Sequence, residues 1–155
     1  MAKQAATRQV VGWREWVGLP GLQLAHIKVK VDTGARTSAL HAFLIEPYTE
    51  NGIAMLRFLI HPIQRNVDFE VECRCAVFDQ REVTDSGGNT EMRYVIQTEM
   101  AFGADRGPIE MTLTNRDTMA FRMLLGRRAM EDRYVVDPAA SYLKGKLRPR
   151  KLYGI

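Results

Sequence analysis

Cysteine and histidine are scarce in this sequence, and their placement does not favour a metal site. The chain has two cysteines and three histidines among 155 residues. Cys73 and Cys75 are one residue apart in an alternating segment, so both would point to one face of a strand, and residues this close rarely form a disulfide with each other. We expect buried or half-buried thiols. Because His26, His41 and His61 are scattered and form no helical pair of zinc ligands, we expect no metal and no cofactor.

Long apolar runs are also missing. The longest are short segments such as residues 123–125, far below the roughly 20 residues that a membrane-spanning helix needs. Residues 1–9 are polar and contain no apolar signal core. We therefore expect no membrane partner, no export and a cytoplasmic location.

The charge balance is mildly basic. The formal net charge is +4, and 46% hydrophobic with 26% charged residues is an ordinary composition for one globular domain. A basic chain favours acidic partners such as an acidic peptide, a ribosomal surface or nucleic acid. Only residues 144–151 form a dense basic run, which is more typical of a solvated end than of a binding site. We expect a single domain over residues 1–155, with flexible ends at 1–10 and 144–155.

Strand periodicity dominates the rest of the chain. Apolar and polar residues alternate, or apolar residues cluster, at 27–31, 53–60, 67–77, 94–102, 109–113 and 122–125. Turn-forming residues separate these segments. One helix is predicted from Arg127 to about Arg133, because Gly126 precedes it and residues 135–138 end it at a proline. The pattern predicts a mostly β domain, a small and mainly antiparallel barrel or sandwich.

An Asp-Thr-Gly tripeptide ends one of the predicted strands. It consists of Asp32, Thr33 and Gly34, after the apolar Val31. An aspartic peptidase needs a carboxylate on a tight turn, a glycine where the backbone bends to expose it, and a neighbouring hydroxyl that fixes the turn. The same tripeptide also occurs in ordinary structural turns, so the interpretation depends on a second motif.

The second motif is an apolar strand, residues 123–125, that ends at Gly126. In this order, with strands between them, the two motifs resemble the retropepsin fold, in which an apolar-apolar-Gly strand lies beside the catalytic turn. Residues 30–42, with further matches at 11–16, 81–93 and 123–129, resemble a bacterial family often labelled ATP-dependent zinc proteases. Some relatives of that family are associated with ligases that add glutamates to a small-subunit ribosomal protein. The resemblance spans about Val11 to Leu143.

The resemblance implies a retropepsin-like acid protease lobe, a closed antiparallel barrel with one short C-terminal helix, and aspartic endopeptidase activity. In such a site two nearby carboxylates share one proton, and the ionised carboxylate activates a water that attacks the peptide carbonyl. One chain carries a single Asp-Thr-Gly. We therefore expect a homodimer with Asp32 and its symmetry mate at the two-fold axis, and Asp32, Thr33 and Gly34 as the catalytic residues.

Substrate contacts are expected around this turn. Retroviral relatives cover the cleft with a flexible Gly-rich hairpin, which residues 84–89 resemble; the segment 50–78 is longer than a minimal lobe needs and leaves the hairpin's geometry open. Arginines near the turn, the hairpin and the second motif would suit carboxylate side chains. The family association implies a glutamate-rich substrate, such as a polyglutamate tail on a ribosomal protein. The predicted substrate-binding residues are Ala35, Arg36, Arg81, Ser86, Gly87, Gly88, Arg93 and Arg127.

Other functions remain open at this point. A catalytically silent domain could bind acidic peptides or a ribosomal protein, although a binder does not need the poised carboxylate of Asp32. No aromatic-basic motif of the known single-strand readers is present, so we expect no direct nucleic-acid partner. A zinc-dependent protease, as the family label states, would need a ligand cluster that the sequence does not display. The arginines could also hold structural carboxylates such as Glu91 or Asp117, which would leave substrate specificity to apolar pockets.

Overall fold

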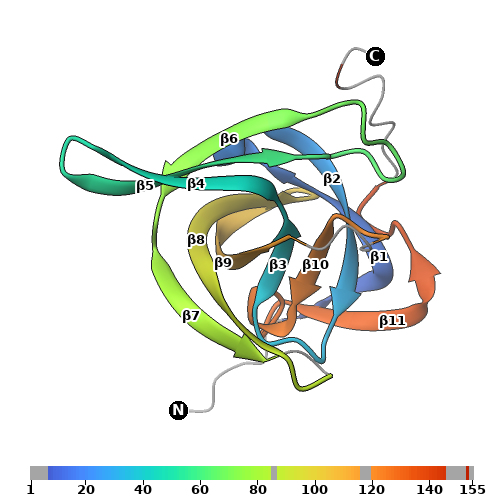
Figure 1. Cartoon of the computed structure of the whole chain (residues 1–155). Coiled ribbons are helices and arrows are strands. Elements are labelled where there is room, and N and C mark those ends of the chain that lie inside the picture. Colours follow the sequence, from blue (N-terminus) through green and yellow to red (C-terminus); the bar gives the residue numbers. More distant parts are fainter. Residues whose placement is uncertain (1–6, 85–86, 116–119, 146–152, 154–155) are drawn as a thin grey trace.

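The computed structural model describes residues 7–84, 87–115, 120–145 and 153, and these form a β-structure in two sheets (Figure 1). The predicted flexible ends lie mostly outside these residues. The described chain contains eleven strands and two 3-10 turns. In chain order they are β1 (Gln9–Leu19), η1 (Pro20–Leu22), β2 (Leu24–Asp32), β3 (Ser38–His41), β4 (Phe43–Glu50), β5 (Ile53–Ile60), β6 (Val71–Ala76), β7 (Asp79–Thr84), β8 (Thr90–Phe102), β9 (Asp105–Thr114), β10 (Met123–Gly126), η2 (Arg127–Ala129) and β11 (Tyr134–Ser141).

Six strands of the larger sheet form a ring. The sheet has the order β11-β1-β2-β10-β3-β9-β8-β7, and a further pairing joins β1 to β8 at Gly18 and Ala101. The mostly β fold class is therefore confirmed. The ring is mixed rather than wholly antiparallel, because β10 runs parallel to β2 and β3 runs parallel to β9. Since the chain reverses between β2 and β3, a strand inserted between them must be parallel to one of the two.

The predicted helix after Gly126 is shorter than expected. Only Arg127–Ala129 form a 3-10 turn, and Asp132 has a left-handed φ of 66°. The helix cannot reach Arg133, because Tyr134 already begins β11 and pairs with Gln9 of β1. Tertiary strand pairing thus overrides the local helix signal.

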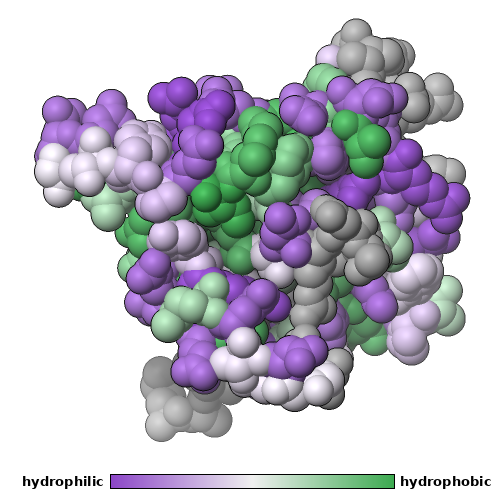
Figure 2. All heavy atoms as spheres, viewed as in Figure 1, coloured by the Kyte–Doolittle hydropathy of each residue, from purple (hydrophilic) through white to green (hydrophobic). Residues whose placement is uncertain are grey.

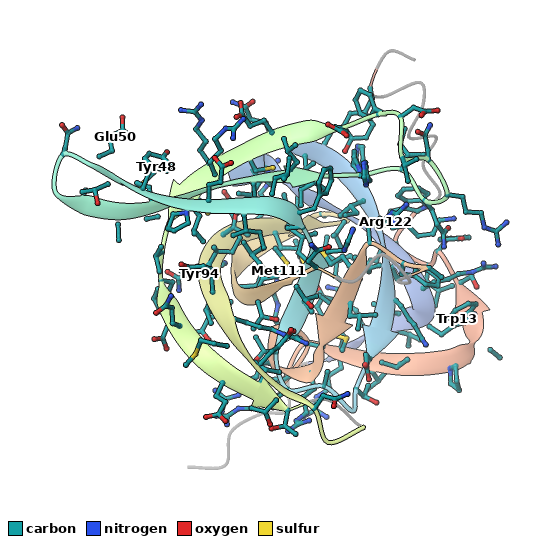
Figure 3. All side chains as sticks on the ribbon, in the orientation of Figure 1. Trp13, Tyr48, Glu50, Tyr94, Met111 and Arg122 are labelled. Atoms are coloured by element: carbon teal, nitrogen blue, oxygen red, sulfur yellow. The ribbon has the colours of Figure 1, made fainter. Side chains whose placement is uncertain are left out.

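Alternating apolar residues of the ring fill its interior. Ile27 and Val29 on β2, Leu40 on β3, Met111 on β9 and Met123 on β10 are fully buried. Figure 3 labels Met111 near the centre of the ring. Burying side chains of this size stabilises the fold by about 1.5–3 kcal/mol each, and this core holds β2 and β10 side by side.

The segment after β3 builds the second sheet, in the order β4-β5-β6. One face of β5, with Leu56, Phe58 and Ile60, is buried in the same core. The β4–β5 hairpin projects from the ring, turns at the left-handed Asn51 and Gly52, and carries Tyr48 and Glu50 (Figures 1 and 3). Figure 2 shows hydrophilic side chains over much of this hairpin and apolar ones gathered beside its base. The extra length predicted for residues 50–78 therefore forms most of a separate sheet.

The two cysteines lie on β6 of this sheet. Cys73 is buried and Cys75 is half-buried, and both are free thiols, as predicted. Burial raises the pKa of Cys73 to about 12 and that of Cys75 to about 11. Both are therefore protonated and poorly nucleophilic near neutral pH.

No helix among the described residues is long and apolar enough to cross a membrane.

A buried carboxylate attaches the chain after β11 to β1. Glu15 has no solvent exposure and accepts hydrogen bonds from the backbone amides of Gly12 (2.6 Å), Leu143 (2.9 Å) and Lys144 (3.0 Å). A second link joins the amide of Tyr142 to the carbonyl of Arg14 at 3.0 Å. Glu15 thus satisfies three amides at once.

We expect Glu15→Ala to lower the free energy of unfolding by about 3 kcal/mol, because it leaves buried amides without their charged acceptor. Urea denaturation followed by tryptophan fluorescence measures this change. Glu99→Ala is the control, because Glu99 is exposed and its ion pair with Arg106 is a long one, at 3.9 Å. Loss of such a surface pair should change the free energy of unfolding by less than about 0.5 kcal/mol. Equal midpoints for the two variants would contradict the role given to Glu15.

Candidate active site

Strand β2 ends in a tight turn at Asp32, which we call the Asp32 turn (residues 32–35). The amide of Gly34 donates to Asp32 Oδ1 at 3.1 Å, and the amide of Ala35 donates to the Asp32 carbonyl at 3.2 Å. A Cβ on Gly34 would lie 3.3 Å from Asp32 Oδ1, closer than most Cβ contacts. The glycine therefore lets the backbone approach the carboxylate, whose side chain is half-buried while Thr33 is exposed.

Strand β10 lies directly beside this turn. Leu125 pairs with Val31 and Gly126 with Asp32, in parallel register. The amide of Gly126 donates to Ser38 Oγ at 3.0 Å. The next two residues continue the contact, since the amide of Arg127 donates to the Ala35 carbonyl (2.8 Å) and that of Arg128 to the Arg36 carbonyl (3.1 Å). The apolar-apolar-Gly strand thus supports the turn, in the arrangement predicted from the two motifs.

The Asp32 turn opens into a cleft of about 1090 Å³. Strand β7 lines the cleft with Arg81, Glu82, Val83 and Thr84. In Figure 1 the turn after β2 and the end of β7 lie at the same edge of the molecule. Strands β8 and β9 contribute further walls. The remaining residues that line the cleft are Asp32, Gly34, Ala35, Arg36, Thr37, Ala39, Arg93, Gln97, Pro108, Ile109, Glu110, Thr112, Leu124, Arg128 and Ala129.

The structure brings most of the predicted site residues to this cleft. Asp32, Gly34, Ala35, Arg36, Arg81 and Arg93 all line it, whereas Thr33, Gly87, Gly88 and Arg127 do not. Ser86 lies outside the described residues. The predicted hairpin exists: β7 and β8 pair from Asp79 to Thr84, and the hydroxyls of Thr84 and Thr90 lie 3.0 Å apart near its tip. Gly88 has a φ of 83°, as a glycine turn allows.

Two cleft arginines are already paired with carboxylates. Arg81 Nε donates to Asp79 Oδ2 (2.8 Å) and Arg81 Nη1 to Glu110 Oε2 (2.9 Å). The hydrogen bond from Arg81 holds the pKa of Asp79 below its ordinary value. Arg93, which is only 9% exposed, donates through Nε to Glu91. Because Arg81 and Arg93 are direct cross-strand partners, these carboxylates offset a repulsion that would otherwise destabilise the hairpin.

The arginines next to the Asp32 turn have a different environment. Arg127 points its guanidinium at the turn, with Nη1 donating to the Gly34 carbonyl at 3.3 Å. Arg128, which sequence reasoning missed, lines the cleft in its place. Arg36 and Arg128 are both exposed, and no carboxylate among the described residues pairs with either. The sequence signal for Arg128 was only its position after Arg127.

Metal ligands do not gather at this site or elsewhere in the described part of the chain. No group of three or more His, Cys, Asp or Glu side chains there is arranged to hold an ion. The charged groups that line the cleft in the described residues are the carboxylates of Asp32, Glu82 and Glu110 and the guanidinium groups of Arg36, Arg81, Arg93 and Arg128.

Comparisons with known proteins give a family for this chain and longer relatives that contain a similar segment. Residues 10–147 match the family described as RimB-like, "Retropepsin-like aspartic endopeptidase RimB". A protein of Parasynechococcus marenigrum named "Probable alpha-L-glutamate ligase" is 46% identical over 143 residues, which cover 92% of this chain and 31% of that protein. A Shewanella pealeana protein of the same name is 42% identical over 149 residues, covering 94% of this chain and 32% of that protein. The chain thus spans about a third of the length of these curated relatives.

A solved structure supports the fold. The crystal structure of a Legionella pneumophila protein of unknown function superposes with a TM-score of 0.74 at 26% identity. The match covers 89% of this chain and 99% of the other.

Proposed function

Because this chain belongs to the RimB-like family of retropepsin-like aspartic endopeptidases, we propose that it hydrolyses peptide bonds with water activated between two Asp32 carboxylates. The observation that carries this proposal is the Asp32 turn itself. Its carboxylate is held by the Gly34 amide, supported from behind by β10, and lines a cleft that β7 borders. This is the arrangement that a poised acid or base requires.

The reaction needs two such carboxylates. Side by side they share one proton, since both cannot ionise without strong repulsion. The ionised carboxylate takes a proton from the water that attacks the peptide carbonyl, while the protonated carboxylate donates its proton to the carbonyl oxygen. When the C–N bond breaks, the first carboxylate passes the proton from water to the leaving amine, and the second takes a proton back from a hydroxyl of the tetrahedral intermediate. No covalent enzyme intermediate forms.

The second carboxylate comes from a second copy of the chain. Asp32 is the one aspartate among the described residues that line the cleft. The other acidic residues that line the cleft are Glu82 and Glu110, and Glu110 already accepts a hydrogen bond from Arg81. An isologous homodimer, with both Asp32 turns at its two-fold axis, completes the site without any further residue type.

The substrate we propose is acidic. Relatives that contain a segment like this chain within one third of their length are named glutamate ligases, and a peptidase linked to such a ligase would act on the glutamate chains that it makes. A glutamate tail on a ribosomal protein fits this description, and cleavage of it would take place in the cytoplasm. Cationic side chains at the cleft agree with an acidic substrate. Incubation with an oligoglutamate-tailed peptide, followed by mass spectrometry of the products, tests the proposal.

Activity should depend on dimer population. Dilution below the dimer dissociation constant is expected to reduce the activity per milligram, because a lone protomer holds one carboxylate. Sedimentation velocity at each concentration gives the dimer fraction against which the activity is plotted. Full activity from a species that sediments as a monomer would refute the two-chain site.

A further inference from the structure

Four arginines among the described residues line the cleft, and they fall into two classes according to whether a carboxylate pairs with them. Arg81 and Arg93 lie opposite each other on the β7–β8 hairpin, and Arg36 and Arg128 lie next to the Asp32 turn. All four would attract an acidic substrate if they were equally available.

The hairpin arginines are not equally available. Two carboxylates, Asp79 and Glu110, hold Arg81, and Glu91 holds Arg93, while Glu91 also accepts from Thr114 Oγ1 at 3.2 Å. A substrate carboxylate would have to displace one of these partners. Since three acids already face two cations, the hairpin offers no net positive charge to an incoming anion.

Arg36 and Arg128 differ from the hairpin arginines in their exposure and in their lack of a described carboxylate partner. Both side chains are exposed, both line the cleft with Asp32, and no described carboxylate pairs with them. Their backbones are fixed to each other, because the Arg128 amide donates to the Arg36 carbonyl at 3.1 Å. The preceding bond, from the Arg127 amide to the Ala35 carbonyl at 2.8 Å, fixes both to the Asp32 turn. The pair is thus anchored at its base and open at its charged ends.

We propose that Arg36 and Arg128 bind carboxylate side chains of the substrate beside the scissile bond, and that Arg81 and Arg93 stabilise the hairpin instead. This inference rests on the proposed peptidase function. Guanidinium groups pair bidentately with carboxylates, and in a partly enclosed cleft such pairs are less screened than on an open surface. In the two-fold dimer each side of the scissile bond would meet one Arg36–Arg128 pair, so acidic residues on both sides would be favoured. A run of glutamates has this property at every bond.

The test compares two peptides of equal length, one with an oligoglutamate segment and one with oligoglutamine, which has nearly the same shape without charge. In the double variant Arg36→Gln/Arg128→Gln, KM for the glutamate peptide should rise about ten-fold or more, a change of about 1.4 kcal/mol. KM for the glutamine peptide should stay within about two-fold of wild type. Arg65→Gln is the matched control, because Arg65 is an exposed arginine outside the cleft; it should leave both values unchanged.

A second variant separates recognition from folding. Arg81→Gln should lower the urea midpoint and leave the ratio of the two KM values as in wild type, since its carboxylate partners belong to the fold. The inference is overturned if the double variant keeps the wild-type preference for glutamate, or if Arg81→Gln removes that preference at an unchanged midpoint.

Binding measurements keep this inference distinct from the peptidase proposal. Fluorescence anisotropy of a labelled oligoglutamate peptide is recorded with wild type, the double variant and Arg65→Gln. If wild type binds without cleaving and only the double variant loses about ten-fold in affinity, the peptidase proposal fails and the arginine assignment stands. If wild type neither binds nor cleaves the peptide, the arginine assignment is refuted as well.

Discussion

Replacing Asp32 with asparagine should remove nearly all peptidase activity while leaving the fold intact. The asparagine amide oxygen can still accept the hydrogen bond that the Gly34 amide donates to Asp32 Oδ1 at 3.1 Å. It cannot take a proton from water or share one with a second carboxylate. We expect a fall in kcat of roughly 10,000-fold, the size of loss seen when a central catalytic group is removed. Cleavage of the oligoglutamate-tailed peptide and the urea midpoint are measured on the same preparation.

Two controls make this result specific. Asp68→Asn makes the same chemical change at an exposed loop position and should leave activity as in wild type. Mixing wild type with an excess of Asp32→Asn protein should also suppress wild-type activity, because most wild-type protomers then pair with a partner that has no second carboxylate. Activity of the variant within a few-fold of wild type would remove the aspartic mechanism and favour a binding domain or a metal-dependent enzyme.

The local signals that proved reliable were those that depend on backbone geometry. Alternation around Ile27 and Val29 placed β2 and its buried face, because strand period and burial follow from the same side-chain geometry. The tripeptide from Asp32 to Gly34 placed the turn, and the apolar strand ending at Gly126 placed its neighbour. The mostly β fold and the family resemblance inferred from these segments are confirmed.

Features that depend on distant parts of the chain were beyond sequence reasoning. The helix predicted after Gly126 is a single turn because β11 must begin at Tyr134 to pair with β1. Likewise, nothing in the sequence separates Arg81 from Arg128. Only the folded chain shows that Arg81 donates a hydrogen bond to Glu110, which is 29 residues away from it in the sequence. Ion pairing across strands is set by register, which alternation alone does not fix.

Gly126→Ala should destabilise the protein more than any other single change considered above. An added Cβ would lie 2.6 Å from the Thr37 carbonyl carbon and 2.8 Å from both the Ser38 nitrogen and the Thr37 oxygen. These are backbone atoms, so no rotamer change can relieve the overlap. Either β10 moves away from Thr37 and Ser38, or the chain at these two residues moves. We expect a loss of about 4 kcal/mol or more in the free energy of unfolding, measured by urea denaturation.

The effect should extend to function, because Gly126 is the register partner of Asp32. Even under conditions where the variant remains folded, a displaced Asp32 turn could not bring two carboxylates to one water, so activity should be lost together with stability. Gly52→Asn is the matched glycine variant: Gly52 has a φ of 78° and no atom within 4 Å of an added Cβ, and asparagine tolerates that conformation. It should stay within about 1 kcal/mol of wild type. A Gly126→Ala protein with the wild-type midpoint would show that β10 does not pack against Thr37 and Ser38 as closely as described, and the position of Gly126 beside Asp32 would then not depend on that packing.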